Sequence, residues 1–131
     1  MIIIEQSAVI PFKKGSNGIE ILLVSTRKKN WTIPKGIVED GLNPVESALK
    51  EALEEAGITG SVKKKKTGTY RYKKWGDVCE VAVYKMKVKK VHKKWEEENF
   101  RKRIWVELKD IPLFLKKKKL IKIIFKAFEN E

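Results

Sequence analysis

The sequence predicts an α+β domain over residues 1–131, in which helices flank a mixed sheet. Two kinds of periodicity lead to this prediction. Residues 2–12, 19–26, 67–72, 78–91 and 103–108 read as strands, and apolar and polar side chains alternate in residues 78–84, as they do in half-buried strands. Residues 44–56 and 113–128 instead repeat their apolar side chains every three or four positions, as amphipathic helices do. A chain of 131 residues can bury one core, so we expect a single domain.

The strands are predicted to form two hairpins. The first joins residues 2–12 and 19–26 through Gly15-Ser16-Asn17-Gly18, whose residues tolerate positive φ. The second joins residues 67–72 and 78–91. Pro112 separates the last strand from the closing helix, whose apolar side chains are Leu120, Ile121, Ile124, Phe125 and Phe128.

The helix over residues 44–56 has well-defined ends. Asn43 is a good N-cap, Pro44 suits the first turn, and Gly57 fits the position after the last turn. Within the helix, Glu51, Glu54 and Glu55 are related by i+3 and i+4, so they share one face. The opposite face is apolar and consists of Val45, Ala48, Leu49, Ala52 and Ala56.

Charge is distributed unevenly along the chain. The formal net charge is +13, but residues 36–58 hold one base against six acids, a net of −5, and the remainder holds 29 bases against 11 acids, or +18. A solvated acidic face with i,i+4 pairs of about 0.2–0.5 kcal/mol each is the ordinary alternative. However, Glu51, Glu54 and Glu55 have no cationic residue three or four places further on. Hard oxygen ligands in this number predict a site for Mg²⁺ or Mn²⁺.

The acidic segment resembles a known family motif. Gly36, Glu51, Ala52, Glu54, Glu55, Gly57 and Ile58 match in register the Nudix box, G-x5-E-x7-R-E-U-x-E-E-x-G-U with U aliphatic, and residues 31–35 are similar to the segment that precedes it. Two positions depart from the motif, because Leu42 stands in place of its first Glu and Lys50 in place of Arg. We interpret this joint change as one altered supporting contact.

The resemblance implies a Nudix-like α/β/α sandwich and a chemistry. It implies hydrolysis of a nucleoside diphosphate linked to another group, with a divalent metal held by Glu51, Glu54 and Glu55 and by the carbonyl of Gly36. The general base would be a helix glutamate or one of residues 96–98, of which we favour Glu97. The pattern of Trp95, Glu97, Arg101, Arg103 and Trp105, with Leu42, is similar to bacterial relatives of diphosphoinositol polyphosphate and dinucleoside polyphosphate hydrolases.

Cationic and aromatic residues are candidates for substrate binding. We expect Arg27, Lys35, and Arg101 or Arg103 to bind phosphate, because arginine presents a fork of donors and lysine a point charge. Tyr70 is a candidate for stacking a base, although a hydrophobic cover is an equal alternative. The lysine runs at residues 63–66 and 116–119 are expected to be solvated faces.

Three functions remain open at this point. The first is a pyrophosphohydrolase acting on a phosphate-rich small molecule, with a dinucleoside polyphosphate favoured. The second is an RNA 5′-pyrophosphohydrolase, which would need a basic groove with stacking aromatics. The third is a non-catalytic nucleotide-binding module with an altered box. We expect a cytoplasmic monomer or homodimer with no membrane partner, since no apolar run approaches about 20 residues and the N-terminus lacks signal-peptide features.

Overall fold

A mixed eight-stranded sheet organises the chain, and the computed structural model describes residues 2–130. The central strand pair is parallel: β1 runs beside β7 from Ile3 opposite Val78 to Phe12 opposite Lys87. The sheet order is β3-β2-β1-β7-β5, with β4 paired to β1, β6 to β7 and β8 to β2. The strands are β1 (Ile3–Gly15), β2 (Gly18–Ser25), β3 (Trp31–Thr32), β4 (Lys35–Ile37), β5 (Ile58–Val62), β6 (Gly68–Lys74), β7 (Asp77–Val91) and β8 (Arg103–Glu107).

Both predicted hairpins are confirmed. β1 and β2 pair antiparallel up to Gly15 opposite Gly18, and Gly18 has a φ of 116°. β6 and β7 are joined by Trp75 and Gly76, whose φ values are 50° and 81°. A two-residue turn with two positive φ angles matches the right-handed twist of the strands it connects.

The helix predicted over residues 44–56 is confirmed in its bounds. α1 (Pro44–Glu51) continues into one wider π-helical turn, η1 (Ala52–Ala56), and Gly57 ends it with a φ of 65°. Asn43 accepts a hydrogen bond from the Glu46 amide, and the Glu46 carboxylate accepts one from the Asn43 amide. The buried face packs on the sheet through Ala48, Ala52, Ala56, Val9, Leu22, Val24, Ile58 and Met86.

The prediction of one closing helix over residues 113–128 is wrong in one respect. The chain forms η2 (Leu108–Asp110), α2 (Ile111–Phe114) and α3 (Lys118–Ala127), with an extended Leu115 between the last two. In a continuous helix, Lys117 would share a face with Leu113, Leu120 and Ile121, at spacings of three or four. The break instead buries Leu115 and leaves Lys117 exposed.

Short strands were also missing from the sequence prediction. β5 is an edge strand with a bulge between Thr59 and Gly60, and a Cβ at Gly60 would overlap the Lys87 carbonyl oxygen. Its sequence, ITGSV, has a glycine at its centre, which weakens the strand signal. β3 and β4 have only two and three residues, too few for a period to be read.

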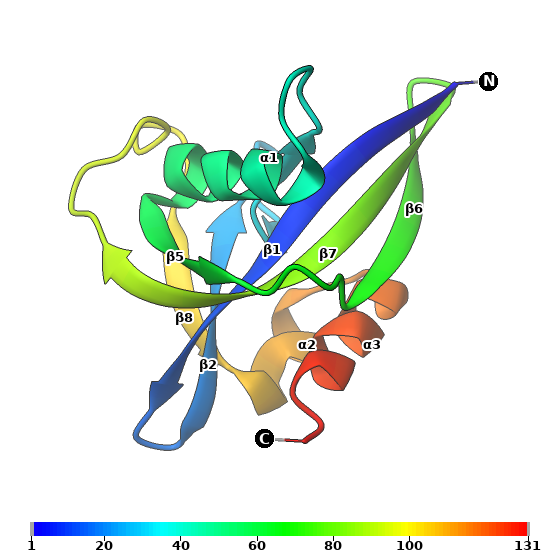
Figure 1. The fold of residues 1–131 in the computed structure, drawn as a ribbon. Coiled ribbons are helices and arrows are strands. Elements are labelled where there is room, and N and C mark those ends of the chain that lie inside the picture. Colours follow the sequence, from blue (N-terminus) through cyan, green and yellow to red (C-terminus); the bar gives the residue numbers. More distant parts are fainter. Residues whose placement is uncertain (1, 131) are drawn as a thin grey trace.

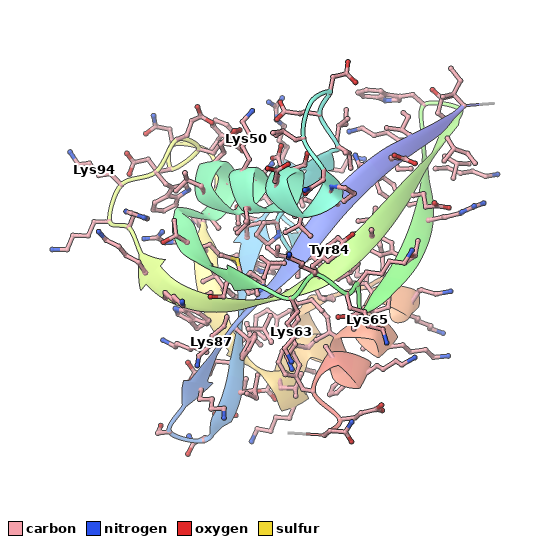
Figure 2. The ribbon with its side chains drawn as sticks, in the orientation of Figure 1. Lys50, Lys63, Lys65, Tyr84, Lys87 and Lys94 are labelled. Carbon is pink, nitrogen blue, oxygen red and sulfur yellow. The ribbon has the colours of Figure 1, made fainter. Side chains whose placement is uncertain are left out.

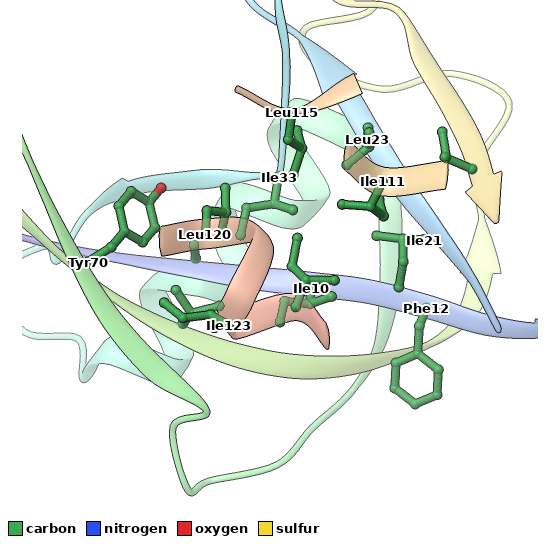
Figure 3. Close-up of a cluster of buried hydrophobic side chains, with 14 of the residues drawn as sticks. Ile10, Phe12, Ile21, Leu23, Ile33, Tyr70, Ile111, Leu115, Leu120 and Ile123 are labelled. Atoms are coloured by element: carbon green, nitrogen blue, oxygen red, sulfur yellow. The ribbon is translucent and has the colours of Figure 1, made fainter. Parts of the chain in front are cut away.

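Helices cover both faces of the sheet, as expected for an α/β/α sandwich. Figure 1 shows α1 on one face and α2 and α3 on the other. The larger core lies on the side of α2 and α3, and Figure 3 shows Tyr70 within it beside Leu120 and Ile123. No helix in the described part of the chain is long and apolar enough to cross a membrane.

Candidate active site

A cavity of about 680 Å³ opens at one end of the sheet, where β4, β6, helix α1 and the break between α2 and α3 meet. We refer to it as the central cavity. Two carboxylates, those of Glu51 and Glu55, line it. The cationic side chains in its lining are Arg27, Lys28, Lys35, Lys74, Arg101, Lys116 and Lys117. The cavity therefore brings a small acidic area against a much larger basic one.

Glu51 and Glu55 lie one helical turn apart and both face the cavity. Glu55 is buried, with 6% of its surface exposed, and its Oε1 accepts a hydrogen bond of 3.3 Å from the Lys35 amide. Gly36 lies directly against Glu51, since a Cβ there would overlap the carboxyl group. Gly36 thus leaves room for the Glu51 side chain, and both residues belong to the Nudix-box motif.

Burial disfavours the charged forms of these carboxyl groups. It raises the pKa of Glu55 to about 8, with Glu51 and Glu97 acting in the same direction and Arg101 opposing them. Burial also raises the pKa of Glu51, although a hydrogen bond with Glu55 offsets part of the effect. A cation placed between the two carboxylates would stabilise their ionised forms.

The oxygen-rich donor set fits a hard divalent cation such as Mg²⁺ or Mn²⁺. Glu51 and Glu55 would hold it, and the Gly36 backbone lies beside them. Within residues 2–130, no three His, Cys, Asp or Glu side chains already converge as a metal site. Glu54 lies 3.8 Å from Lys50, and Glu97 accepts a hydrogen bond from Arg101, so either side chain would have to turn to become a third ligand.

Arg101 connects the helix to the loop that precedes β8. Its Nε donates to Glu97 Oε1 at 2.6 Å, and its Nη1 donates to the Ser25 carbonyl at 2.8 Å. Its Nη2 lies 3.6 Å from Glu55 Oε2. The Glu97 amide in turn donates to the Glu54 carbonyl at 3.1 Å. The loop glutamate is thereby held close to the helix carboxylates, although the two are more than 40 residues apart in the sequence.

Tyr72 organises the basic wall of the central cavity. Its hydroxyl accepts a hydrogen bond of 3.2 Å from Lys35 Nζ and donates one of 2.7 Å to Gln6 Oε1. Lys35 Nζ lies 4.9 Å and Lys117 Nζ 4.2 Å from the centre of the Tyr72 ring. Two ammonium groups from distant segments thus share one aromatic ring. Burial lowers the pKa of Lys35, and the charges of Lys117 and Lys74 add to this effect.

The structure brings only part of the predicted site together. Gly36, Glu51, Glu55, Lys35, Arg27 and Arg101 meet at the central cavity. Glu54 is on the same helix outside the lining, and desolvation raises its pKa.

Arg103 and Tyr70 lie elsewhere. The Arg103 guanidinium stacks on Trp95 at 3.8 Å and donates hydrogen bonds to the carbonyls of Ala56 and His92. The Arg103 side chain therefore provides a hydrogen-bond donor for the backbone carbonyl of Ala56, the last residue of η1. Tyr70 is 3% exposed and belongs to the larger core.

Several cavity residues were not identified from the sequence. Tyr72 lies two positions after Tyr70 on the same face of β6, so strand alternation was the available signal. Lys116 and Lys117 are exposed, as expected, and both also line the central cavity. The run at residues 63–66 is exposed as expected, and Figure 2 labels Lys63 and Lys65 in this run.

Comparisons with known proteins agree with the fold and the box. The family model described as the NUDIX domain matches residues 6–128. Nudix hydrolase 21, chloroplastic, of Arabidopsis thaliana is 34% identical over 102 residues, which are 75% of this chain and 51% of that protein. The bis(5′-nucleosyl)-tetraphosphatase [asymmetrical] of Mus musculus is 42% identical over 62 residues, 46% of this chain and 42% of that one.

Solved structures show the same fold. The Caenorhabditis elegans Ap4A hydrolase binary complex superposes with a TM-score of 0.77 at 22% identity and covers 95% of this chain and 94% of that one. The chain spans about half the length of the curated relatives described above.

Proposed function

Because the chain belongs to the NUDIX domain family, we propose that it is a metal-dependent pyrophosphohydrolase. The substrate would contain a diphosphate linkage, and a dinucleoside polyphosphate is favoured. One observation carries the proposal: the Glu51 and Glu55 carboxylates and a wall of lysine and arginine side chains line the same cavity. Diphosphate hydrolysis needs both, since the carboxylates can hold a cation and the basic side chains can bind the phosphate oxygens.

A bound divalent ion would neutralise phosphate oxygens and lower the pKa of a water molecule. The chain itself would supply orientation and proton transfer. Lys35, held by Tyr72, would bind a phosphate beside the carboxylates. We assign Glu97 as the general base, supported by the 2.6 Å hydrogen bond that its Oε1 accepts from Arg101 Nε, which orients the carboxylate. Arg101 also lies near Glu55 and would keep both glutamates in place.

The substrate preference rests on charge and on the relatives. Lys74, Lys116 and Lys117 line the same cavity as the carboxylates, and a long phosphate chain would contact more of these lysines than a two-phosphate linkage would. The names of two similar proteins, an Ap4A hydrolase and a bis(5′-nucleosyl)-tetraphosphatase, point to the same substrate class.

A substrate screen tests the proposal. Purified protein with Mg²⁺ or Mn²⁺ would be assayed against dinucleoside polyphosphates, nucleotide sugars, inositol pyrophosphates, nucleoside triphosphates and 5′-triphosphate RNA. We expect hydrolysis of dinucleoside polyphosphates, abolished by chelation of the metal. Preferential release of pyrophosphate from RNA would instead support the RNA alternative. Nucleotide binding without turnover of any of these compounds would identify a binding module.

A further inference from the structure

A second cavity of about 770 Å³ lies next to the central one. We call it the outer cavity. Thr26, Arg27, Trp31 and Arg101 line both, so the two spaces adjoin along a shared wall. None of these four residues is buried.

Two tight turns form the walls of the outer cavity. In the first, the Thr26 amide donates to the Asn30 carbonyl at 2.7 Å, and the Asn30 amide donates to Thr26 Oγ1 at 3.1 Å. In the second, the Phe100 and Arg101 amides both donate to the Glu97 carbonyl, at 3.2 Å and 3.0 Å. These bonds hold the walls in place before any ligand arrives.

Ser25 ties the two turns together. Its amide donates to the Lys102 carbonyl at 2.9 Å, and its Oγ accepts a hydrogen bond from the Lys102 amide at 2.8 Å. The Arg101 side chain adds a third bond, to the Ser25 carbonyl. Because the turns are linked at their bases, the distance across the cavity is set by the fold.

Phe100 is the exposed aromatic residue of this cavity. It is 54% exposed, and the Arg27 guanidinium lies 5.9 Å from the centre of its ring. Arg27 is itself exposed, so it can move without disturbing the core. Atoms in van der Waals contact are about 3.5–4.0 Å apart, so a flat ring between the two would need about 7 Å. A shift of about 1 Å by Arg27 would open that space.

We propose that the outer cavity binds a nucleobase at the far end of the substrate's phosphate chain, stacked on Phe100 and covered by Arg27. This inference rests on the proposed hydrolase function. Every nucleobase has a π-face, so stacking on an aromatic side chain stabilises its binding with little dependence on which base it is. The site would thus favour a substrate that carries a base at the end of its phosphate chain over one that ends in phosphate.

Steady-state kinetics of Phe100→Ala provide the first test. The KM for diadenosine tetraphosphate should rise by about tenfold. The inhibition constant of inorganic tripolyphosphate, which has a phosphate chain and no base, should not change. Phe100→Tyr should restore the wild-type KM. Phe125→Ala is the matched control, because Phe125 is an exposed phenylalanine on α3, outside the lining of both cavities. Equal changes for substrate and tripolyphosphate, or no change, would overturn the proposal.

A binding experiment separates this proposal from the hydrolase function. Metal-free protein would be titrated with adenosine 5′-monophosphate and followed by NMR. We expect amide shifts concentrated at residues 98–102 and lost in Phe100→Ala. Shifts confined to the central cavity, or unaffected by the substitution, would refute base binding at Phe100 even in an active enzyme. If the protein shows these shifts but hydrolyses none of the screened substrates, the hydrolase function is refuted and base binding is not.

Discussion

Lys50 binds Glu39 through both carboxylate oxygens, with Nζ 2.9 Å from Oε1 and 2.8 Å from Oε2. Leu42 occupies the motif position at which a glutamate would be expected, and Lys50 the position of its arginine. Glu39, three residues before Leu42, thus provides the carboxylate that Leu42 lacks. The Glu39 amide donates to Ser47 Oγ at 3.1 Å, which fastens the same loop to α1. The altered box therefore retains an ion pair between the loop and the helix.

A double-mutant cycle on Glu39 and Lys50 should reveal this pair. We expect Glu39→Gln and Lys50→Met to be non-additive in denaturant unfolding at low salt, and the coupling to shrink at high salt because both side chains are exposed. Leu42→Glu and Lys50→Met serve as the control cycle and should be closer to additive. Stronger coupling of Lys50 to position 42 than to Glu39 would show that the contact has been misassigned.

Stability without metal should fall as the pH rises. The pKa of Glu55 is raised to about 8, so between its unfolded-state pKa and that value the folded protein binds more protons than the unfolded chain. Its contribution to stability is therefore present at acidic pH and lost as pH increases through about 8. Thermal melts in chelator across this range should show a falling Tm for wild type and a flatter profile for Glu55→Gln. A Tm that rises for wild type over the same range would contradict the buried-carboxyl explanation.

Replacing the helix carboxylates should separate catalysis from folding. We expect Glu51→Gln, Glu54→Gln and Glu55→Gln each to reduce turnover by on the order of 10²-fold or more, since the charge that holds the cation is lost. Tm in chelator should stay unchanged or rise, because the crowded carboxylates repel one another. Glu5→Gln, an exposed residue on β1 outside the cavity lining, is the control. Near wild-type turnover at saturating Mg²⁺ for all three variants would place the metal site elsewhere.

Lys117 should matter most for long phosphate chains. Lys117→Ala is expected to raise KM more for dinucleoside tetra- to hexaphosphates than for a nucleotide sugar, because a longer phosphate chain contacts more of the basic cavity wall in which Lys117 lies over Tyr72. Lys118→Ala is the matched control, since Lys118 is the next residue of the same run and is exposed outside the cavity lining. Equal effects of the two variants would mean that only the overall charge counts.

Salt dependence tests the same charges as a group. The exposed lysines act over about 10 Å at 0.1 M salt, so kcat/KM for a long polyphosphate should fall steeply as ionic strength increases. The Lys117→Ala variant should show a shallower dependence than Lys118→Ala. If kcat/KM does not change with ionic strength, the basic side chains do not attract the substrate electrostatically from solution.

The sequence by itself determined the elements whose signals are local. Asn43, Pro44 and Gly57 mark the two ends of the helix formed by α1 and η1, because helix caps depend on neighbouring backbone groups. Helical spacing alone places Glu51 and Glu55 on one face, and short turns with glycine identify both hairpins. The mixed sheet with flanking helices follows from these elements in order.

Tertiary structure decided the remainder of the site, because those contacts join segments far apart in the chain. The charge of Arg103 suggests a phosphate ligand, yet the fold places its guanidinium over Trp95 and against the Ala56 carbonyl at the end of η1. Lys117 is exposed, as the sequence predicts, but only the break between α2 and α3 places it over Tyr72 in the lining of the central cavity. Residue type and local period cannot distinguish these outcomes, since they depend on which strand pairs with which and on how the closing helix packs.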